Sequence, residues 1–211
     1  MRSTAHRRCT GWTRTGLWPR PHQAALDELG GCGMLDGSAG DRGRRRRLSG
    51  KGGSLTGADP VDRARMGSRI HVLSEAEGLP PVVGVRAAGT ADTAGIPVFK
   101  PLLLAIPPIR SRRGPRRRRP GKARAGKART PPACGNGCAG AVSSRASPAV
   151  ASSPAGACGT APVCAIECTI AWLLCYRRLG VGRERHGHLF AAFLTLAAAL
   201  IRFKKRTHIT T

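Results

Sequence analysis

Acidic and aromatic residues are scarce in this chain of 211 residues. Asp and Glu together number 11 against 36 Lys and Arg, which gives a formal net charge of +25. Such an excess exceeds what solubility needs and indicates a polyanionic partner, with nucleic acid favoured over an anionic membrane surface. Aromatic residues make up 4% of the chain, beside 28 glycines and 16 prolines. This mixture is poor for a continuous core and predicts that parts of the chain stay unfolded.

Long apolar runs are also lacking. The longest is "LFAAFLTLAAALI", residues 189–201, which falls short of the roughly 20 residues that cross a bilayer. We therefore expect a buried helix there, and no membrane partner. The first residues are basic and contain no apolar segment, so they do not resemble a secretory signal. Without export, the eight cysteines are not expected to form a disulfide framework.

The pattern of apolar residues predicts one hairpin and several helices. The hairpin has strands around Ile70–Leu73 and Val82–Arg86, joined by a turn through Glu75–Gly78. Helices are expected at 22–29, within the apolar stretch 98–108, at 164–179 and at 188–205. Residues 37–57, which are rich in Gly and Arg, read as loop, and residues 130–162 read as disordered.

Two possible metal sites carry little weight. Cys134 and Cys138 lie in the tract predicted to be disordered, while Cys164 and Cys168 lie one turn apart on a helix. A zinc site usually joins such a pair to a second pair or to histidines, and here the first pair lies in a structureless tract while a glutamate separates the cysteines of the second, so zinc is not favoured. His186 and His188 are expected to face solvent near the start of the last helix.

Residues 110–129 contain eleven positive charges and no acid. Such tracts are often merely solvated tails, but they are also well suited to neutralising phosphates. Because the tract has no aromatic residues, base stacking is not indicated. The sequence predicts non-specific contact with the DNA backbone through Arg110, Arg112, Arg113, Arg116, Arg117, Arg118, Arg119, Lys122, Arg124 and Lys127.

The stretch "IECTIAWLLCYRRLG", residues 166–180, places Glu167 at the edge of an apolar helix. On these residues alone, the simplest interpretation is an acid in the first turn that stabilises the helix dipole. Four stretches, taken in their order along the chain, support another interpretation of Glu167. "GLWPRPHQAALDELG", "GGSLTGADPVDRARMGSRIHVLSEAEGLPPVVGV", "LLLAIPPIRSRRGPRRRRPGKARAGKA" and "IECTIAWLLCYRRLGVGRERHGHLFAAFLTLAAAL" resemble, collinearly, bacterial insertion-sequence DDE transposases of family five, sister to family four.

The resemblance implies an α/β RNase H-like domain in which two aspartates and one glutamate bind two Mg²⁺ ions for phosphoryl transfer on DNA. It also implies a bacterial cytoplasmic, nucleoid-associated protein. Glu167 matches the glutamate, in a segment like "WxIERTIAWL". The second aspartate belongs to a segment like "KLRADKAY", where this chain has Gly126. The first falls near Gly43, whereas Asp36 matches a non-catalytic aspartate and Asp41 lies out of register. One ligand of three remains, so we expect Mg²⁺ not to be bound.

Shifted reading frames would explain these losses. Back-translated residues 134–158, read one base earlier, give a peptide like the family's segment between the second aspartate and the glutamate. Residues 37–46, read one base later, yield an aspartate codon across Gly43 and Arg44. We therefore interpret the chain as a degenerate reading frame, with 1–36 as an N-terminal helical remnant and 37–211 as an incomplete RNase H-like domain. Residues 37–51 and 130–163 are expected to be out of frame and irregular.

Three hypotheses follow. The first is a transposase-family protein that is inactive as written. The second is a non-enzymatic basic protein that binds nucleic acid through residues 110–129. The third is a peripheral membrane protein held by its C-terminal helix and the basic residues after it.

Overall fold

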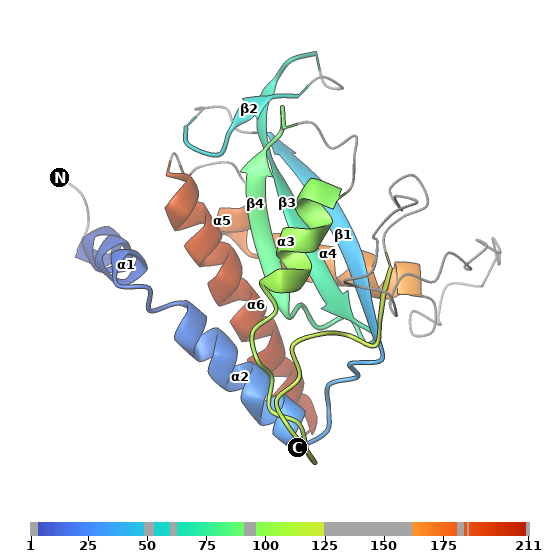
Figure 1. Cartoon of the computed structure of the whole chain (residues 1–211). Coiled ribbons are helices and arrows are strands. Elements are labelled where there is room, and N and C mark those ends of the chain that lie inside the picture. The colour runs from blue at the N-terminus through green and yellow to red at the C-terminus, as the bar shows by residue number, and fades with distance from the viewer. Residues whose placement is uncertain are drawn as a thin grey trace.

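A twisted sheet flanked by helices forms the body of the protein (Figure 1). The computed structural model describes residues 4–48, 53–59, 63–90, 96–124, 162–180, 184 and 186–209. The strands run in the order β4-β3-β1-β5, and a short β2 pairs with the start of β3. Their bounds are β1 Ala39–Leu48, β2 Gly57–Ala58, β3 Met66–Glu75, β4 Val82–Ala87 and β5 Lys122–Arg124. Neighbouring strands are antiparallel except β5, which is parallel to β1.

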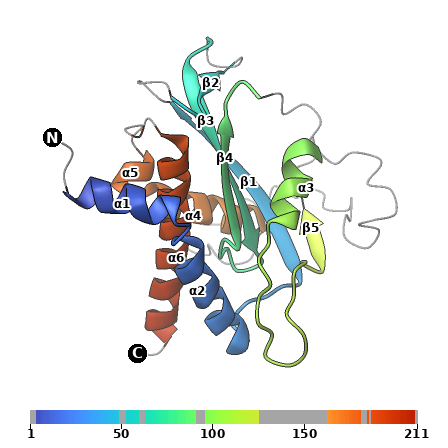
Figure 2. The ribbon, with the colours of Figure 1, turned by 60° about the vertical axis from the view of Figure 1, so that its left-hand side comes forward.

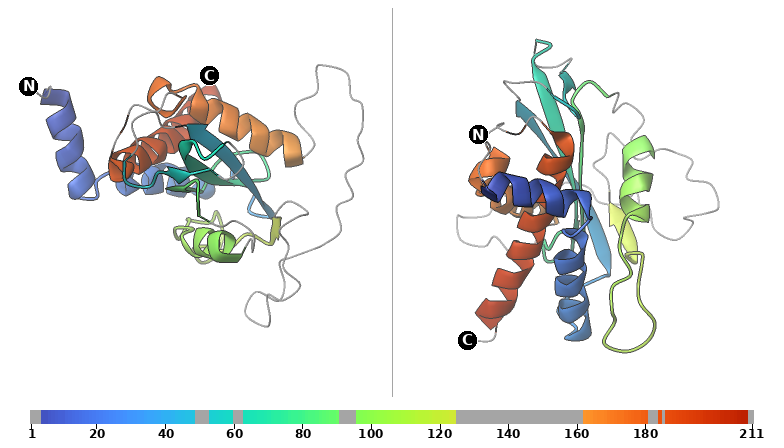
Figure 3. Two further views of the ribbon diagram at one scale, coloured as in Figure 1. Left: turned by 90° about the horizontal axis from the view of Figure 1, so that it is seen from above. Right: turned by 90° about the vertical axis from the view of Figure 1, so that its left-hand side faces the viewer.

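Helices cover both faces of this sheet (Figure 3). Their bounds are α1 Thr4–Arg14, α2 Pro19–Gly31, α3 Ile96–Leu104, α4 Pro162–Leu174, α5 Arg177–Gly180 and α6 Gly187–Ile209. Helices α4 and α6 pack on one face and α3 on the other, while α2 lies along α6 (Figure 2). Helix α1 touches α6 and has no buried residue, so it projects from the body.

Two apolar clusters fill the space between these layers. The larger one joins Ile70 and Val72 of β3 to α4, α6 and Leu29 of α2. The smaller one joins Leu73 of β3 and Val82 of β4 to α3 and to Ala123 of β5. Successive residues of β3 thus point into opposite clusters, as the two-residue period of a strand requires. Strand β3 is buried on both faces and is the centre of the fold.

The structure corrects the expectation of an irregular segment at 37–51. Residues 39–48 form a regular strand whose partners on β3 run from Gly40↔Glu75 to Leu48↔Gly67. The prediction was wrong because it assumed that a strand needs an alternating apolar pattern in its own sequence. Backbone hydrogen bonds pair β1 with β3, and the apolar side chains of the core come from β3, so Arg44 and Arg45 can remain exposed.

Most other predicted elements are confirmed with shifted ends. The hairpin is present, with its turn closed by a hydrogen bond from the Gly78 N–H to the Glu75 carbonyl. The predicted helix at 22–29 is α2. The predicted helix at 98–108 is α3, which starts earlier and ends at Leu104 with Pro101 inside it. The predicted helix at 164–179 is divided, because α4 ends at Leu174 and α5 begins at Arg177. Most of 130–163 lies outside the described residues.

Helix α6 is longer than the apolar run from which it was predicted. Residues 187–205 are long and apolar enough to cross a membrane by length and composition alone. However, Leu189, Phe190, Leu194, Ala198 and Ile201 are buried against the rest of the protein. A core helix accounts for this apolar character, so α6 gives only weak support to the membrane hypothesis.

Candidate functional site

Helix α4 lies directly over Gly43, the position matched to the first aspartate. A Cβ atom placed on Gly43 would lie 2.4 Å from Cγ1 of Ile166 and 2.8 Å from Cδ1 of Ile170. Ile166, Ile170 and Leu173 form the buried stripe of α4, at helical spacing. Thr169 fixes the helix further, because its hydroxyl lies within hydrogen-bonding distance of the Gly78 carbonyl in the hairpin turn.

Glu167 follows Ile166 and is exposed. The first turn of α4 contains no acid, because the helix begins at Pro162. The interpretation of Glu167 as a first-turn residue at the positive end of the helix dipole is therefore wrong. Its place next to Ile166 instead brings Glu167 to the part of α4 that crosses Gly43. The structure thus places the helix that carries Glu167 against the strand that contains Gly43.

The third position, Gly126, lies outside the described residues, as does Lys127. The strand that precedes it, β5, is paired with β1 in the register Ala39↔Lys122, Gly40↔Ala123 and Asp41↔Arg124. Gly43 follows Asp41 by two residues, just as Gly126 follows Arg124 by two. The segment that leads to Gly126 is therefore adjacent to the strand that contains Gly43.

The residues present do not fit a two-metal site. Among the described residues, no three His, Cys, Asp or Glu side chains gather closely enough to hold a metal ion. Mg²⁺ needs several oxygen ligands, and a metal pair needs carboxylates on both sides. Gly43 offers no side chain, which leaves Glu167 as a single ligand. His186 and His188 are exposed at the start of α6, as predicted.

Sequence reasoning missed a buried carboxylate, Glu75, at the end of β3. Its two oxygens accept hydrogen bonds from the backbone N–H groups of Asp36, Glu77 and Leu79, at 3.0, 3.1 and 3.0 Å. Burial raises the pKa of Glu75, and these hydrogen bonds oppose the rise. Glu75 therefore ties the hairpin turn to the α2–β1 connection and has a structural role. No sequence signal distinguished it from a surface glutamate.

A buried Arg202–His22 pair joins α6 to α2, and sequence reasoning missed it too. The Arg202 side chain is 0% exposed, and its Nη1 lies 3.0 Å from Nδ1 of His22. Nε2 of His22 lies 3.0 Å from the Pro81 carbonyl oxygen. Burial, with a further contribution from the Arg202 charge, lowers the pKa of His22 to about 3. Burial also lowers the pKa of Arg202 to about 9, and the Glu75 charge opposes this. A neutral His22 accepts from Arg202 and donates to Pro81.

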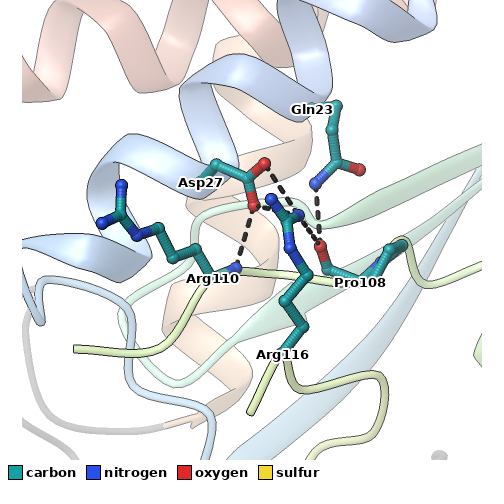
Figure 4. Close-up of polar contacts among 5 residues, drawn as sticks. All are labelled: Gln23, Asp27, Pro108, Arg110 and Arg116. Carbon is teal, nitrogen blue, oxygen red and sulfur yellow. Dashed lines mark hydrogen bonds and ion pairs between the residues drawn. The ribbon is translucent and has the colours of Figure 1, made fainter. Parts of the chain in front are cut away.

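The basic segment between α3 and β5 is folded rather than a free tail. The N–H of Arg110 donates to Oδ1 of Asp27 on α2, at 2.9 Å. Nη1 of Arg116 donates to both oxygens of Asp27, at 3.0 and 2.9 Å, and to the Pro108 carbonyl (Figure 4). The Gln23 amide also donates to the Pro108 carbonyl. Arg116 is thus a structural clip between this segment and α2, while its expected contact with phosphate stays a prediction.

The other arginines of the segment remain available. Arg110, Arg112, Arg113, Arg117, Arg118 and Arg119 are exposed, as is Lys122 on β5. An antiparallel bridge between Ile109 and Arg117 shapes the segment into a loop that stands beside α2 (Figure 2). The fold therefore presents most of the predicted basic residues on one ordered loop.

Comparison with known proteins identifies the family. The chain is 32% identical over 163 residues to a protein of Burkholderia cepacia whose name describes it as a transposase for insertion sequence element IS402. The similarity covers 69% of this chain and 67% of that relative. The chain belongs to the insertion-sequence transposases. No family model matches it, and no solved structure matches it. The relationship accounts for the basic charge of this transposase chain and favours the first hypothesis over the other two.

Proposed function

We propose that this chain is the remnant of a DDE transposase with an RNase H-like fold, which binds DNA but cannot cleave it. The observation that carries the proposal is the contact between Gly43 and Ile166, the neighbour of Glu167. Positions 43 and 167 are far apart in the sequence and were matched to catalytic carboxylates independently of any structure. Because Glu167 follows Ile166, the two positions belong to neighbouring elements, and a shared metal site needs its carboxylates on neighbouring elements.

The order of the strands supports the same proposal. In β4-β3-β1-β5, the antiparallel β3 lies on one side of β1, and β5 lies on the other side, parallel to β1. The two strands that lead to positions 43 and 126 are therefore side by side. With α4 displaced from its present contact with Gly43, an aspartate at each position and Glu167 on α4 would give three carboxylates from three neighbouring elements.

Loss of catalysis follows from the residues that remain. In the family's reaction, Mg²⁺ would supply the activated water and stabilise the charge on the transferred phosphoryl group. Glu167 alone does not hold a metal pair, so the chain has no means of supplying that chemistry. The exposed arginines of the loop would still neutralise phosphates, so the chain keeps DNA binding although it has lost catalysis.

A cleavage assay tests this function. Purified protein is incubated with a DNA duplex that carries the terminal repeats of a related element, in Mg²⁺ or Mn²⁺. We expect binding and no strand cleavage. The positive control is a repaired variant of this chain. It carries aspartate at 126, its segments 37–51 and 130–163 are restored to the family's reading frame, and it should cleave. Glu167→Ala in that protein should abolish cleavage again. Metal-dependent cleavage by the present chain that disappears on Glu167→Ala would refute the proposal.

A further inference from the structure

A cavity of about 230 Å³ lies beneath the basic loop, between the end of α2, the start of β1 and the end of β3. Its floor is apolar and includes Leu26 and Leu73, which are fully buried, and Ile106. Its rim carries four arginines, which are Arg110, Arg112, Arg117 and Arg119. A site for phosphate alone needs only positive or hydrogen-bond-donating groups. An apolar floor beneath a cationic rim instead suits a ligand that has both an apolar part and a negative charge.

Glycines allow the loop to approach the rest of the protein closely enough to form this rim. A Cβ on Gly30 would lie 2.1 Å from the carbonyl oxygen of Arg110. A Cβ on Gly33 would lie 3.3 Å from Cδ of Arg112, and one on Gly37 would lie 3.8 Å from Nη1 of Arg117. The Arg116–Asp27 clip then holds the loop in this position. The rim is therefore built into the fold.

The charge of the rim is not balanced within the part of the chain that the structure describes. The ion pairs there include Arg69–Asp59, Arg116–Asp27, Arg178–Glu184 and Lys205–Glu77. None involves the four rim arginines. Glu75 also lines the cavity, and its carboxylate, which accepts three backbone hydrogen bonds, offsets only part of the charge of four arginines. Four arginines that line one cavity make it strongly cationic, and an anionic ligand would offset that charge.

We propose that this cavity binds one unpaired nucleotide of DNA, with the base or sugar on the apolar floor and the flanking phosphates on the arginine rim. The proposal rests on the DNA-binding function proposed above. The cavity is smaller than the roughly 300–1,000 Å³ of sites that enclose a drug-sized ligand, so it would take part of one nucleotide, such as its base, and not a paired helix. Arginine is the side chain best suited to phosphate, because its donors form a planar fork.

The first test compares a duplex that carries a one-nucleotide bulge with the same duplex fully paired, by fluorescence anisotropy. We expect the bulged duplex to bind about tenfold more tightly, the effect of one charge-assisted contact. Gly37→Leu adds an apolar side chain to the lining of the cavity, near Nη1 of Arg117, without changing any charge, and should abolish the preference. Gly11→Leu adds the same side chain on α1, where a Cβ meets nothing within 4 Å, and should keep it. Equal binding of both duplexes would overturn the proposal.

The second pair of variants tests the rim. Arg112→Gln combined with Arg119→Gln should remove the preference for the bulge, whereas Arg177→Gln on α5 should not. A preference that survives the rim substitutions would overturn the assignment of the rim.

Thermal unfolding with small ligands separates this site from the DNA-binding function. Thymidine monophosphate should raise the melting temperature more than thymidine or inorganic phosphate at the same concentration. Stabilisation by the nucleotide without any DNA binding would support the cavity and refute the proposed function. Equal stabilisation by inorganic phosphate and nucleotide would overturn the nucleotide proposal and leave a phosphate site only.

Discussion

Gly43 of β1 and Ile166 of α4 are in such close contact that no side chain fits between them. A Cβ at position 43 would lie 2.4 Å from Cγ1 of Ile166, well below any normal carbon–carbon contact. The helix that carries Glu167 therefore occupies the space that a side chain at position 43 would need. The same contact links the fold of this chain to its proposed loss of activity.

The first prediction follows from this contact. Gly43→Ala should lower the free energy of unfolding by about 1–3 kcal/mol, the usual cost of overpacking. The double variant with Ile166→Ala should lose less stability than the two single variants lose in sum, because the two side chains compete for one space. Urea unfolding of the single and double variants measures this. The matched control is Gly84→Ala on β4, where a Cβ would lie 3.5 Å from Cδ1 of Leu102, an ordinary contact. Equal effects at positions 43 and 84 would contradict the close packing of α4 on β1.

The second prediction concerns the clip between Arg116 and Asp27. Arg116 is about half exposed and Asp27 is more buried, so Asp27→Asn should cost about 0.5–1 kcal/mol at neutral pH. Partial burial of Asp27 raises its pKa, but the hydrogen bond from Arg110, with those from Gln23 and Arg116, outweighs this and leaves the pKa lowered. A carboxylate with a lowered pKa stabilises the fold above its unfolded pKa and loses that effect as pH falls. The difference between Asp27→Asn and the parent should therefore shrink in acid. Arg118→Gln on the same loop is the control and should change little.

The sequence predicted the parts of this fold that have their own hydrophobic period. The hairpin of β3 and β4 and the helices α2, α4 and α6 were all expected, because their apolar residues repeat at two or at three to four residues. Strand β1 was not expected, because the sheet around it supplies what its own residues lack. A strand with little apolar content can be recognised only when its partner is known.

The candidate site shows the same limit. Glu167 and Gly43 were identified from the family resemblance, and the structure places their segments in contact. The clip of Arg116, the buried Glu75 and the Arg202–His22 pair were missed, because each depends on a partner far away in the sequence. Composition alone could not separate Arg116 from the arginines beside it. The contact with Asp27 distinguishes Arg116 from its neighbours, and such a tertiary contact cannot be read from the local sequence pattern.

The third prediction concerns DNA binding by the arginines that the clip leaves free. Replacing Arg117, Arg118 and Arg119 with glutamine should reduce the slope of log affinity against log salt by about 0.9 for each phosphate that is no longer neutralised. Replacing Arg116 should instead act mainly on stability. The measurement is a salt titration by anisotropy on a fully paired duplex. A slope that stays unchanged in the triple variant would show that the loop does not contact phosphate.

The last prediction concerns pH and the buried Arg202–His22 pair. His22 has a pKa of about 3 in the folded protein, against about 6.5 for an exposed histidine. Between these values the unfolded chain binds a proton that the folded chain does not, so the free energy of unfolding should fall as pH decreases. The slope from this group is at most about 1.4 kcal/mol per pH unit, and the stabilisation is fully present only above about pH 6.5.

His22→Gln isolates this contribution, because glutamine can still accept from Arg202 and donate to the Pro81 carbonyl without titrating in this range. Urea unfolding of parent and variant at pH 7, 6, 5 and 4 gives two curves whose difference removes the titration common to both. The advantage of the parent should shrink as pH falls, and the variant should become the more stable protein if its amide fits the site well. His186→Gln replaces an exposed histidine and serves as the control. Parallel curves for parent and His22→Gln would mean that His22 is not held neutral by Arg202 and its burial.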